Sequence, residues 1–346
     1  RVITGTDAKG HNTVEFETVF KDTSRTALFA ITTIYENLNG EVWIGTLRGL
    51  LKLSFQNNDA FLPEGGSIYT TAEGLNSDQV MAFQKDPEGN YWIGTSKGLC
   101  VLNGKTNKIK QIQFPPSTYL ITMAEVNNFC ISSDGTFWIA SGRGLYTLSS
   151  EEVKNVFNVS PELHPFEYKT KQNNSGAICI REDKISKGIM WVGTGASGII
   201  KLISDKGKNI YTNHLHEILP TAFVFSIAKD KDGVVWIGTT DGLIRFNKKQ
   251  NQYKLFQSGT RDSKNFRSDY ITNLKFDKND QLWLGSQKGL YKVHKRNSGK
   301  PEFEIITLYS KSQELNIRDL VFDRNGDLIV VLPGRIFHLD INNSLS

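Results

Sequence analysis

One short motif recurs along the whole chain. Each of its six clear copies centres on a tryptophan, and these are all the tryptophans of the 346-residue sequence. The copies read VWIGT, YWIGT, FWIAS, MWVGT, VWIGT and LWLGS, with tryptophans at residues 43, 92, 138, 191, 236 and 283. A degenerate copy without tryptophan follows near residue 329. Self-similarity at intervals of 45 to 53 residues indicates an array built from one supersecondary unit.

Every copy lies between two turn signals. A turn such as Asp86–Gly89 precedes the tryptophan, and a pair such as Gly98-Leu99 begins six residues after it. Short apolar runs separated by such turns predict tight β-hairpins. Several copies add a weaker fourth strand, at residues 108–114, 252–257 and 302–309. Because one four-stranded sheet has two apolar faces, neighbouring sheets must pack on each other, and we expect the tryptophans between them.

Seven such units predict an all-β, seven-bladed β-propeller with four-stranded antiparallel blades, in which residues 1–346 form a single domain. The last copy supplies only three strands, within residues 317–340. An alternating segment at about 13–20 precedes the first copy. We expect this N-terminal strand to complete the last blade, because ring closure removes exposed strand edges. An insertion at Ser149–His164 begins like a capping box and predicts a short helix.

Composition excludes several other classes of protein. The longest segment without a charge, residues 111–124, is shorter than the roughly 20 apolar residues of a transmembrane helix. A net charge of +5 is too small to indicate that this region binds nucleic acid. The chain begins at Arg1 without a signal peptide, so we expect a processed or trimmed product.

Motifs for cofactors and metals lack the context that they need. The sequence GTGASG at residues 193–198 runs into a predicted strand, whereas a dinucleotide fingerprint opens a helix. His214 and His216 have no third ligand nearby in the sequence. We therefore expect no cofactor and no metal. The three cysteines, Cys100, Cys130 and Cys179, lie in apolar segments and are expected to be free thiols.

The repeat resembles a known one. The W-[IVL]-G-T strand, the following G-L pair and the preceding D-x-x-G turn resemble the two-component regulator propeller repeat, over roughly residues 27–340. Residues 73–80, EGLNSDQV, resemble the E-G-L-x-S-x-x-V segment that leads into that repeat. The resemblance implies the periplasmic sensor region of an inner-membrane hybrid two-component regulator, of the kind that Bacteroidetes use to detect glycan fragments. It also implies a second propeller, a β-sandwich and a histidine kinase domain in the parent protein, and a homodimeric receptor.

Candidate ligand-binding residues cluster at one end of the predicted blades. The turns between second and third strands and the loops that connect blades share that end. Five of the seven turns carry a basic residue, and positive charge around one opening favours an anionic ligand such as an acidic oligosaccharide. The turn residues are Arg48, Lys97, Arg143, Ser197, Asp241, Lys288 and Arg335. From the connecting loops we add Tyr119, His216, Arg267 and Tyr270, since aromatic rings present platforms and polar edges to sugars.

Other interpretations stay open beside a non-enzymatic glycan sensor without catalytic residues. The turn residues can simply be solvated, and any single aromatic residue can belong to the core. A propeller glycosidase needs two carboxylates roughly 5–10 Å apart, and a polysaccharide lyase is a related alternative. The connecting loops contain Glu73, Asp78, Glu125, Glu217, Asp262 and Asp269, but no spacing rule pairs them. A third possibility is a protein-docking propeller, which an exposed apolar patch would indicate.

Overall fold

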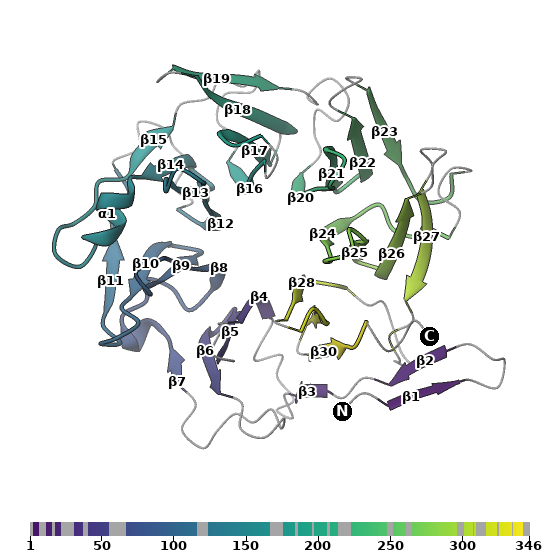
Figure 1. The fold of residues 1–346 in the computed structure, drawn as a ribbon. Helices are drawn as coiled ribbons and strands as arrows, with labels where there is room; N and C mark the ends of the chain where they lie inside the picture. Colours follow the sequence, from purple (N-terminus) through teal and green to yellow (C-terminus); the bar gives the residue numbers. More distant parts are fainter. Residues whose placement is uncertain are drawn as a thin grey trace. The chain divides into compact units, whose positions relative to one another are not determined.

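The chain folds into seven four-stranded antiparallel sheets, which confirms the predicted all-β, seven-bladed propeller (Figure 1). We number the blades 1 to 7 in chain order. The structure, a computed structural model, describes residues 3–6, 12–15, 18–21, 31–36, 41–54, 67–115, 124–166, 176–183, 186–195, 197–205, 208–213, 223–247, 252–260, 265–295, 301–306, 308, 316–323, 325–333 and 335–341.

Blades 1 to 4 follow one another in the sequence. Blade 1 contains β4 (Ile31–Glu36), β5 (Glu41–Thr46), β6 (Gly49–Ser54) and β7 (Ser67–Tyr69). Blade 2 contains β8 (Val80–Lys85), β9 (Tyr91–Thr95), β10 (Gly98–Leu102) and β11 (Ile109–Ile112). Blade 3 contains β12 (Val126–Ile131), β13 (Phe137–Ser141), β14 (Gly144–Leu148) and β15 (His164–Phe166). Blade 4 contains β16 (Ala177–Glu182), β17 (Ile189–Thr194), β18 (Ile199–Asp205) and β19 (Lys208–Asn213).

Blades 5 to 7 repeat the same order. Blade 5 contains β20 (Val224–Lys229), β21 (Val234–Thr239), β22 (Gly242–Asn247) and β23 (Gln252–Phe256). Blade 6 contains β24 (Ile271–Phe276), β25 (Leu282–Ser286), β26 (Gly289–Lys295) and β27 (Pro301–Ile306). Blade 7 contains β28 (Asp319–Phe322), β29 (Leu328–Leu332), β30 (Arg335–Leu339) and β3 (Thr18–Lys21).

Blade 7 is completed by the N-terminal part of the chain. Strand β3 pairs with β30 in antiparallel register, with Thr18 opposite Phe337 and Lys21 opposite Arg335 (Figure 1). The predicted closing strand is therefore confirmed, but its bounds were wrong. Strand β2 (Asn12–Glu15) pairs with β1 (Ile3–Thr6) instead, so the closing strand in the structure is residues 18–21 rather than 13–20.

The chain divides into two compact units. Unit 1 comprises residues 1–44, 52–67 and 228–346, and unit 2 comprises residues 45–51 and 68–227. Each unit contains its own hydrophobic clusters between adjacent blades. That residues 1–346 form a single domain stays a prediction.

Tryptophans pack between adjacent sheets, as the repeat predicts. In unit 2, Trp92 of β9 is fully buried, and its ring centroid lies 4.6 Å from that of Phe137 in blade 3. Gly94 lies two residues further along β9, where an added Cβ would lie 2.7 Å from the carbonyl oxygen of Val126. In unit 1, Trp236 belongs to the cluster that blade 5 forms with blade 6. The large side chain thus fills the space between blades, and the small residue permits their close approach.

A buried polar group holds each of several tryptophan hairpins. In blade 2, Asp86 Oδ1 accepts a hydrogen bond from the Asn90 backbone N–H at 2.7 Å, and its Oδ2 accepts the indole N–H of Trp92 at 2.9 Å. The same carboxylate–indole bond joins Asp230 to Trp236 and Asp277 to Trp283. In these three blades, the aspartate of the turn that precedes the tryptophan therefore accepts a hydrogen bond from its indole N–H.

The predicted insertion in blade 3 contains the short helix α1 (Ser150–Lys154), which confirms that expectation. Ser149 Oγ accepts the backbone N–H of Glu152, and the Glu152 carboxylate accepts the N–H of Ser149, so both halves of the capping box form. Among the described helices, none has both the length and the apolar character that crossing a membrane requires. All three cysteines are free thiols, as expected.

Candidate functional site

The turns between second and third strands share one construction. In blade 1, Thr46 Oγ1 donates to the carbonyl oxygen of Gly49 at 2.8 Å and accepts the backbone N–H of Arg48 at 3.0 Å. Gly49 has a φ of +128°, which disfavours any residue with a Cβ. The same pair of hydroxyl bonds recurs at Thr95, Ser141, Thr239 and Ser286. Each turn therefore holds the backbone of the residue before the glycine in a fixed position.

Several of these turns also bond to the segment that enters their own blade. Ser96 donates its N–H to the carbonyl of Gln79, and Gln287 does the same to Tyr270. In blade 2, Asn76 accepts the Thr95 hydroxyl at 2.7 Å. These bonds place turns and connecting segments at the same end of a blade, as predicted, and they give the E-G-L-x-S-x-x-V segment a structural role.

Three predicted basic residues come from unit 2, on the turns of blades 1, 2 and 3. The side chains of Arg48 and Lys97 are exposed, and Arg143 is half-buried. The guanidinium carbon of Arg143 lies 5.9 Å from the centroid of the Phe114 ring. Its Nε atom is buried and has no hydrogen-bond partner among the described residues. The Arg143 guanidinium is therefore held over the Phe114 ring, and its Nε–H group has no acceptor among the described residues.

Tyr146 packs against the same Phe114 ring and lies close enough to Arg143 to feel its charge. Its ring meets the Phe114 ring edge-on, with 4.9 Å between centroids. Burial raises the pKa of Tyr146, and the positive charge of Arg143 opposes that shift without cancelling it. Tyr146 is therefore a neutral phenol at physiological pH, and the Arg143 charge is not neutralised by it.

A second group of predicted residues lies in unit 1. The backbone N–H of Arg267 donates to the hydroxyl of Tyr291 at 3.2 Å, while the Arg267 side chain is exposed. Lys288 is exposed on the blade 6 turn, and Tyr270 is half-buried on the segment that bonds to this turn. Asp241 is half-buried on the blade 5 turn. The structure therefore places Arg267, Tyr270 and Lys288 at one end of blade 6.

The remaining turn and loop residues are either buried or lie outside the part of the chain whose side chains the structure describes. Ser197 is fully buried, and its backbone N–H donates to Thr194 Oγ1 at 2.9 Å, so this turn residue faces no ligand. For Arg335 the structure describes only the backbone, in β30. Tyr119 and His216 lie outside the described residues. Their proposed contact with a ligand stays a prediction.

Several carboxylates considered for catalysis have structural hydrogen bonds instead. Glu73 accepts the Thr70 hydroxyl at 2.7 Å and caps the 3₁₀ turn η1 (Thr71–Glu73). Asp78 accepts the N–H of Thr71, and Asp269 accepts both the N–H and the hydroxyl of Ser258. Glu217 and Asp262 lie outside the described residues. Within the described residues, these hydrogen bonds indicate that the carboxylates stabilise loops rather than act as catalytic acids or bases.

One polar cluster was not predicted from the sequence. Asp323, Asp327 and His338 in blade 7 each offer a ligand atom, and these three atoms lie within 4.8 Å of one another. The blade 7 turn has the same D-x-x-G pattern as other blades, but here a second aspartate follows it and the tryptophan is absent. The extra aspartate and the missing tryptophan are the sequence features from which this cluster could have been predicted.

Comparison with known proteins supports the fold. No curated protein matches the chain. Among solved structures, the extracellular domain of a one component system from B. thetaiotaomicron has a TM-score of 0.68 at 21% identity, covering 94% of this chain and 40% of that one. The extracellular domain of a hybrid two component system from B. thetaiotaomicron has a TM-score of 0.71 at 18% identity, covering 99% and 45%. The present chain thus spans less than half the length of either.

A third solved neighbour is an enzyme. Virginiamycin B lyase from Staphylococcus aureus has a TM-score of 0.66 at 13% identity, with 94% of this chain and 100% of that chain covered. Identities this low establish a common fold only. At the level of sequence, a family model for the two component regulator propeller matches residues 74–97 and 218–241. These two segments are therefore similar to the two component regulator propeller repeat, in agreement with the resemblance that the W-[IVL]-G-T motif indicated.

Proposed function

We propose that this chain is the ligand-sensing propeller of a two-component signalling protein and that it acts in the periplasm. The matched repeats and the two B. thetaiotaomicron extracellular domains support the proposal. It includes the partners that the sequence resemblance implies: a second propeller and a β-sandwich in the parent chain, a kinase that receives the signal, and a homodimeric receptor. Signalling requires that the ligand bind one arrangement of these parts better than another.

We further propose that the ligand is an anionic oligosaccharide, such as one with uronic acids or sulfates. The observation that carries this is the set of basic turns in unit 2, where Arg48, Lys97 and Arg143 sit on three blades with their backbones fixed. Of the three, Arg143 is the strongest candidate because its guanidinium is held over the Phe114 ring while the residue is only half-buried. A guanidinium binds a carboxylate or sulfate through parallel hydrogen bonds.

Isothermal titration calorimetry with acidic and neutral oligosaccharides tests this proposal. We expect acidic ligands to bind, with affinity that falls as salt concentration rises. Arg143→Gln should weaken binding about tenfold, which is about 1.4 kcal/mol. The matched control is Lys105→Gln, an exposed lysine on the β10–β11 turn at the other end of blade 2. Equal loss in both variants, or no binding of any acidic oligosaccharide, would contradict the proposal.

We propose that binding occurs without turnover. The structural hydrogen bonds of Glu73, Asp78 and Asp269 support this. Mass spectrometry of a bound oligosaccharide after prolonged incubation with the protein tests it. Unchanged ligand is the expected result, whereas release of shorter or unsaturated products would establish the glycosidase or lyase alternative.

A further inference from the structure

Blade 7 replaces the carboxylate–indole bond of blades 2, 5 and 6 with a different pair. Asp323 occupies the position of Asp86, and its Oδ1 accepts the backbone N–H groups of Asn325 and Asp327, both at 2.8 Å. Ile329 stands where the tryptophan would be, directly opposite His338 of β30. Because isoleucine lacks the indole N–H, Asp323 Oδ2 accepts instead from His338 Nε2, at 2.8 Å.

The second aspartate changes the charge of this hairpin. Asn90 in blade 2 occupies the position of Asp327, and its amide donates to Asp86 at 3.1 Å. A carboxylate at that position cannot donate in its ionised form, and Asp327 is only 9% exposed. The blade 7 hairpin thus gathers buried negative charge where blade 2 has a neutral amide.

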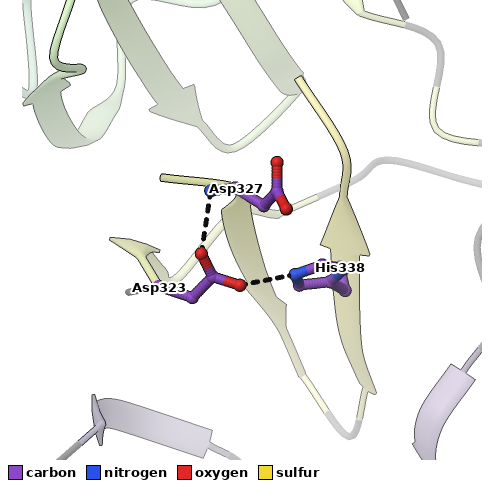
Figure 2. Close-up of side chains that lie close together, drawn as sticks. All are labelled: Asp323, Asp327 and His338. Carbon is purple, nitrogen blue, oxygen red and sulfur yellow. Dashed lines mark hydrogen bonds and ion pairs between the residues drawn. The ribbon is translucent and has the colours of Figure 1, made fainter. Parts of the chain in front are cut away.

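The three side chains have the chemistry of a divalent metal site. Figure 2 shows the Asp323 carboxylate directed at the His338 imidazole, with the Asp327 carboxylate beside them; the three residues come from the β28–β29 turn and from β30. Imidazole together with carboxylate suits first-row transition cations, whereas Ca²⁺ and Mg²⁺ prefer oxygen ligands alone. The bonds from the turn to Asp323 Oδ1 leave Oδ2 directed at His338, as an outer shell of hydrogen bonds orients a metal ligand.

The distances require a small adjustment on binding. Zinc–ligand bonds of about 2.0–2.2 Å place neighbouring ligand atoms roughly 3–3.5 Å apart. The 2.8 Å pair of Asp323 and His338 must therefore open slightly, and the cluster, which spans up to 4.8 Å, must contract. His338 Nε2 must also give up the proton that it shares with Asp323.

We propose that Asp323, Asp327 and His338 bind one divalent first-row transition cation, which ties the β28–β29 turn to β30. Strand β30 also pairs with β3 from the N-terminal part of the chain, so the ion would stabilise the strand on which that pairing depends. The alternative to a metal ion is a proton that the two carboxylates and the imidazole share. This site is independent of the proposed ligand at the basic turns.

Calorimetric titration of ZnCl₂ and MnCl₂ into the tag-free chain, after treatment with a chelator, tests the proposal. We expect one saturable site, with affinity lowered about 100-fold or more in Asp327→Asn and in His338→Gln. The matched control is His294→Gln, which removes a histidine that contacts Glu304 at 2.6 Å on the exposed surface of blade 6. That variant should bind the ion normally.

Thermal unfolding provides a second measurement that does not depend on a variant losing affinity. In chelator, Asp327→Asn should raise the melting temperature, because it removes repulsion between the buried Asp327 carboxylate and its neighbour Asp323. With ZnCl₂ in excess, the wild-type chain should gain stability by mass action and the variant should not. Two results would overturn the proposal: the absence of saturable binding, or binding that Asp327→Asn and His338→Gln leave unchanged. An unchanged melting temperature for Asp327→Asn in chelator, together with no metal binding, would identify a shared proton as the occupant and would also overturn the proposal.

Discussion

Replacing Asp86 by alanine should destabilise the chain by about 3–5 kcal/mol. The carboxylate is 4% exposed and accepts three hydrogen bonds, from the Asn90 N–H at 2.7 Å, the Asn90 amide at 3.1 Å and the Trp92 indole at 2.9 Å. A buried donor left without an acceptor costs about 1–3 kcal/mol. Trp92 is fully buried, so water cannot replace the carboxylate at the indole, while the two Asn90 donors add about 1 kcal/mol each.

Urea unfolding followed by tryptophan fluorescence and far-ultraviolet circular dichroism measures this loss. A double-mutant cycle with Trp92→Phe isolates the carboxylate–indole bond, and we expect a coupling energy of about 1.5–3 kcal/mol. The matched control is Asp232→Ala, which removes an exposed carboxylate from the equivalent turn of blade 5 and should change stability by less than about 0.5 kcal/mol. Asp86→Ser should recover part of the loss, because Ser132 naturally accepts the Trp138 indole at 3.0 Å.

The reasoning would be refuted by two results. A loss below about 1 kcal/mol for Asp86→Ala would mean that water reaches the indole despite its burial. Coupling near zero with Trp92→Phe would mean that the carboxylate stabilises the turn alone and not the tryptophan. Either outcome would remove the physical reason for the aspartate that stands six residues before Trp92, Trp236 and Trp283.

Three further predictions concern packing, thiol reactivity and pH. Gly94→Ala should cost about 1–3 kcal/mol in urea unfolding, because its Cβ would lie 2.7 Å from a backbone oxygen of blade 3. Cys179 should not react with a disulfide reagent at pH 8 until the chain unfolds, since burial raises its pKa to about 12. Ser149→Ala should cost about 1 kcal/mol at pH 7 by removing the cap of α1. Burial alone would raise the pKa of Glu152, but hydrogen bonds from Ser149 and the nearby His164 outweigh burial and lower it. The stabilisation by Glu152 is therefore complete above its unfolded pKa and is lost as the pH falls through the folded value, so the cost of Ser149→Ala should shrink at acidic pH.

Controls for these predictions lie within the chain. Gly195→Ala should be tolerated better than Gly94→Ala, because its added Cβ would meet nothing closer than 3.4 Å. Cys130 is half-buried and should react before Cys179 as the chain is destabilised. A Ser149→Ala cost that is the same at neutral and at strongly acidic pH would show that Glu152 takes no part in the cap.

Local signals in the sequence were sufficient for the blades. The three strands predicted within residues 317–340 are present as β28, β29 and β30, and the closing strand was placed on the correct partner although its bounds differed. Turn chemistry explains this success. A hydroxyl residue and a glycine three positions later form the same hydrogen bonds in blades 1, 2, 3, 5 and 6, so the sequence motif carries its own geometry.

The candidate site was less predictable because it depends on exposure. Arg48, Lys97 and Arg143 occupy equivalent turn positions, yet only Arg143 among them is described as stacking on an aromatic ring and burying its Nε. That ring, Phe114, follows the fourth strand of the preceding blade, and no pattern in the sequence pairs it with Arg143. Ser197 shows the opposite case, since an equivalent turn buried it completely.

The sequence by itself determined that seven similar sheets form and where their turns lie, because hairpins and period-two strands depend on residues close together in the chain. Tertiary structure alone decided which turn residues face solvent and which groups meet in blade 7. Asp323 and His338 are brought together by the pairing of strands, and the charge balance of such a cluster depends on burial. Burial is set by the neighbouring sheets, so no local pattern can encode it.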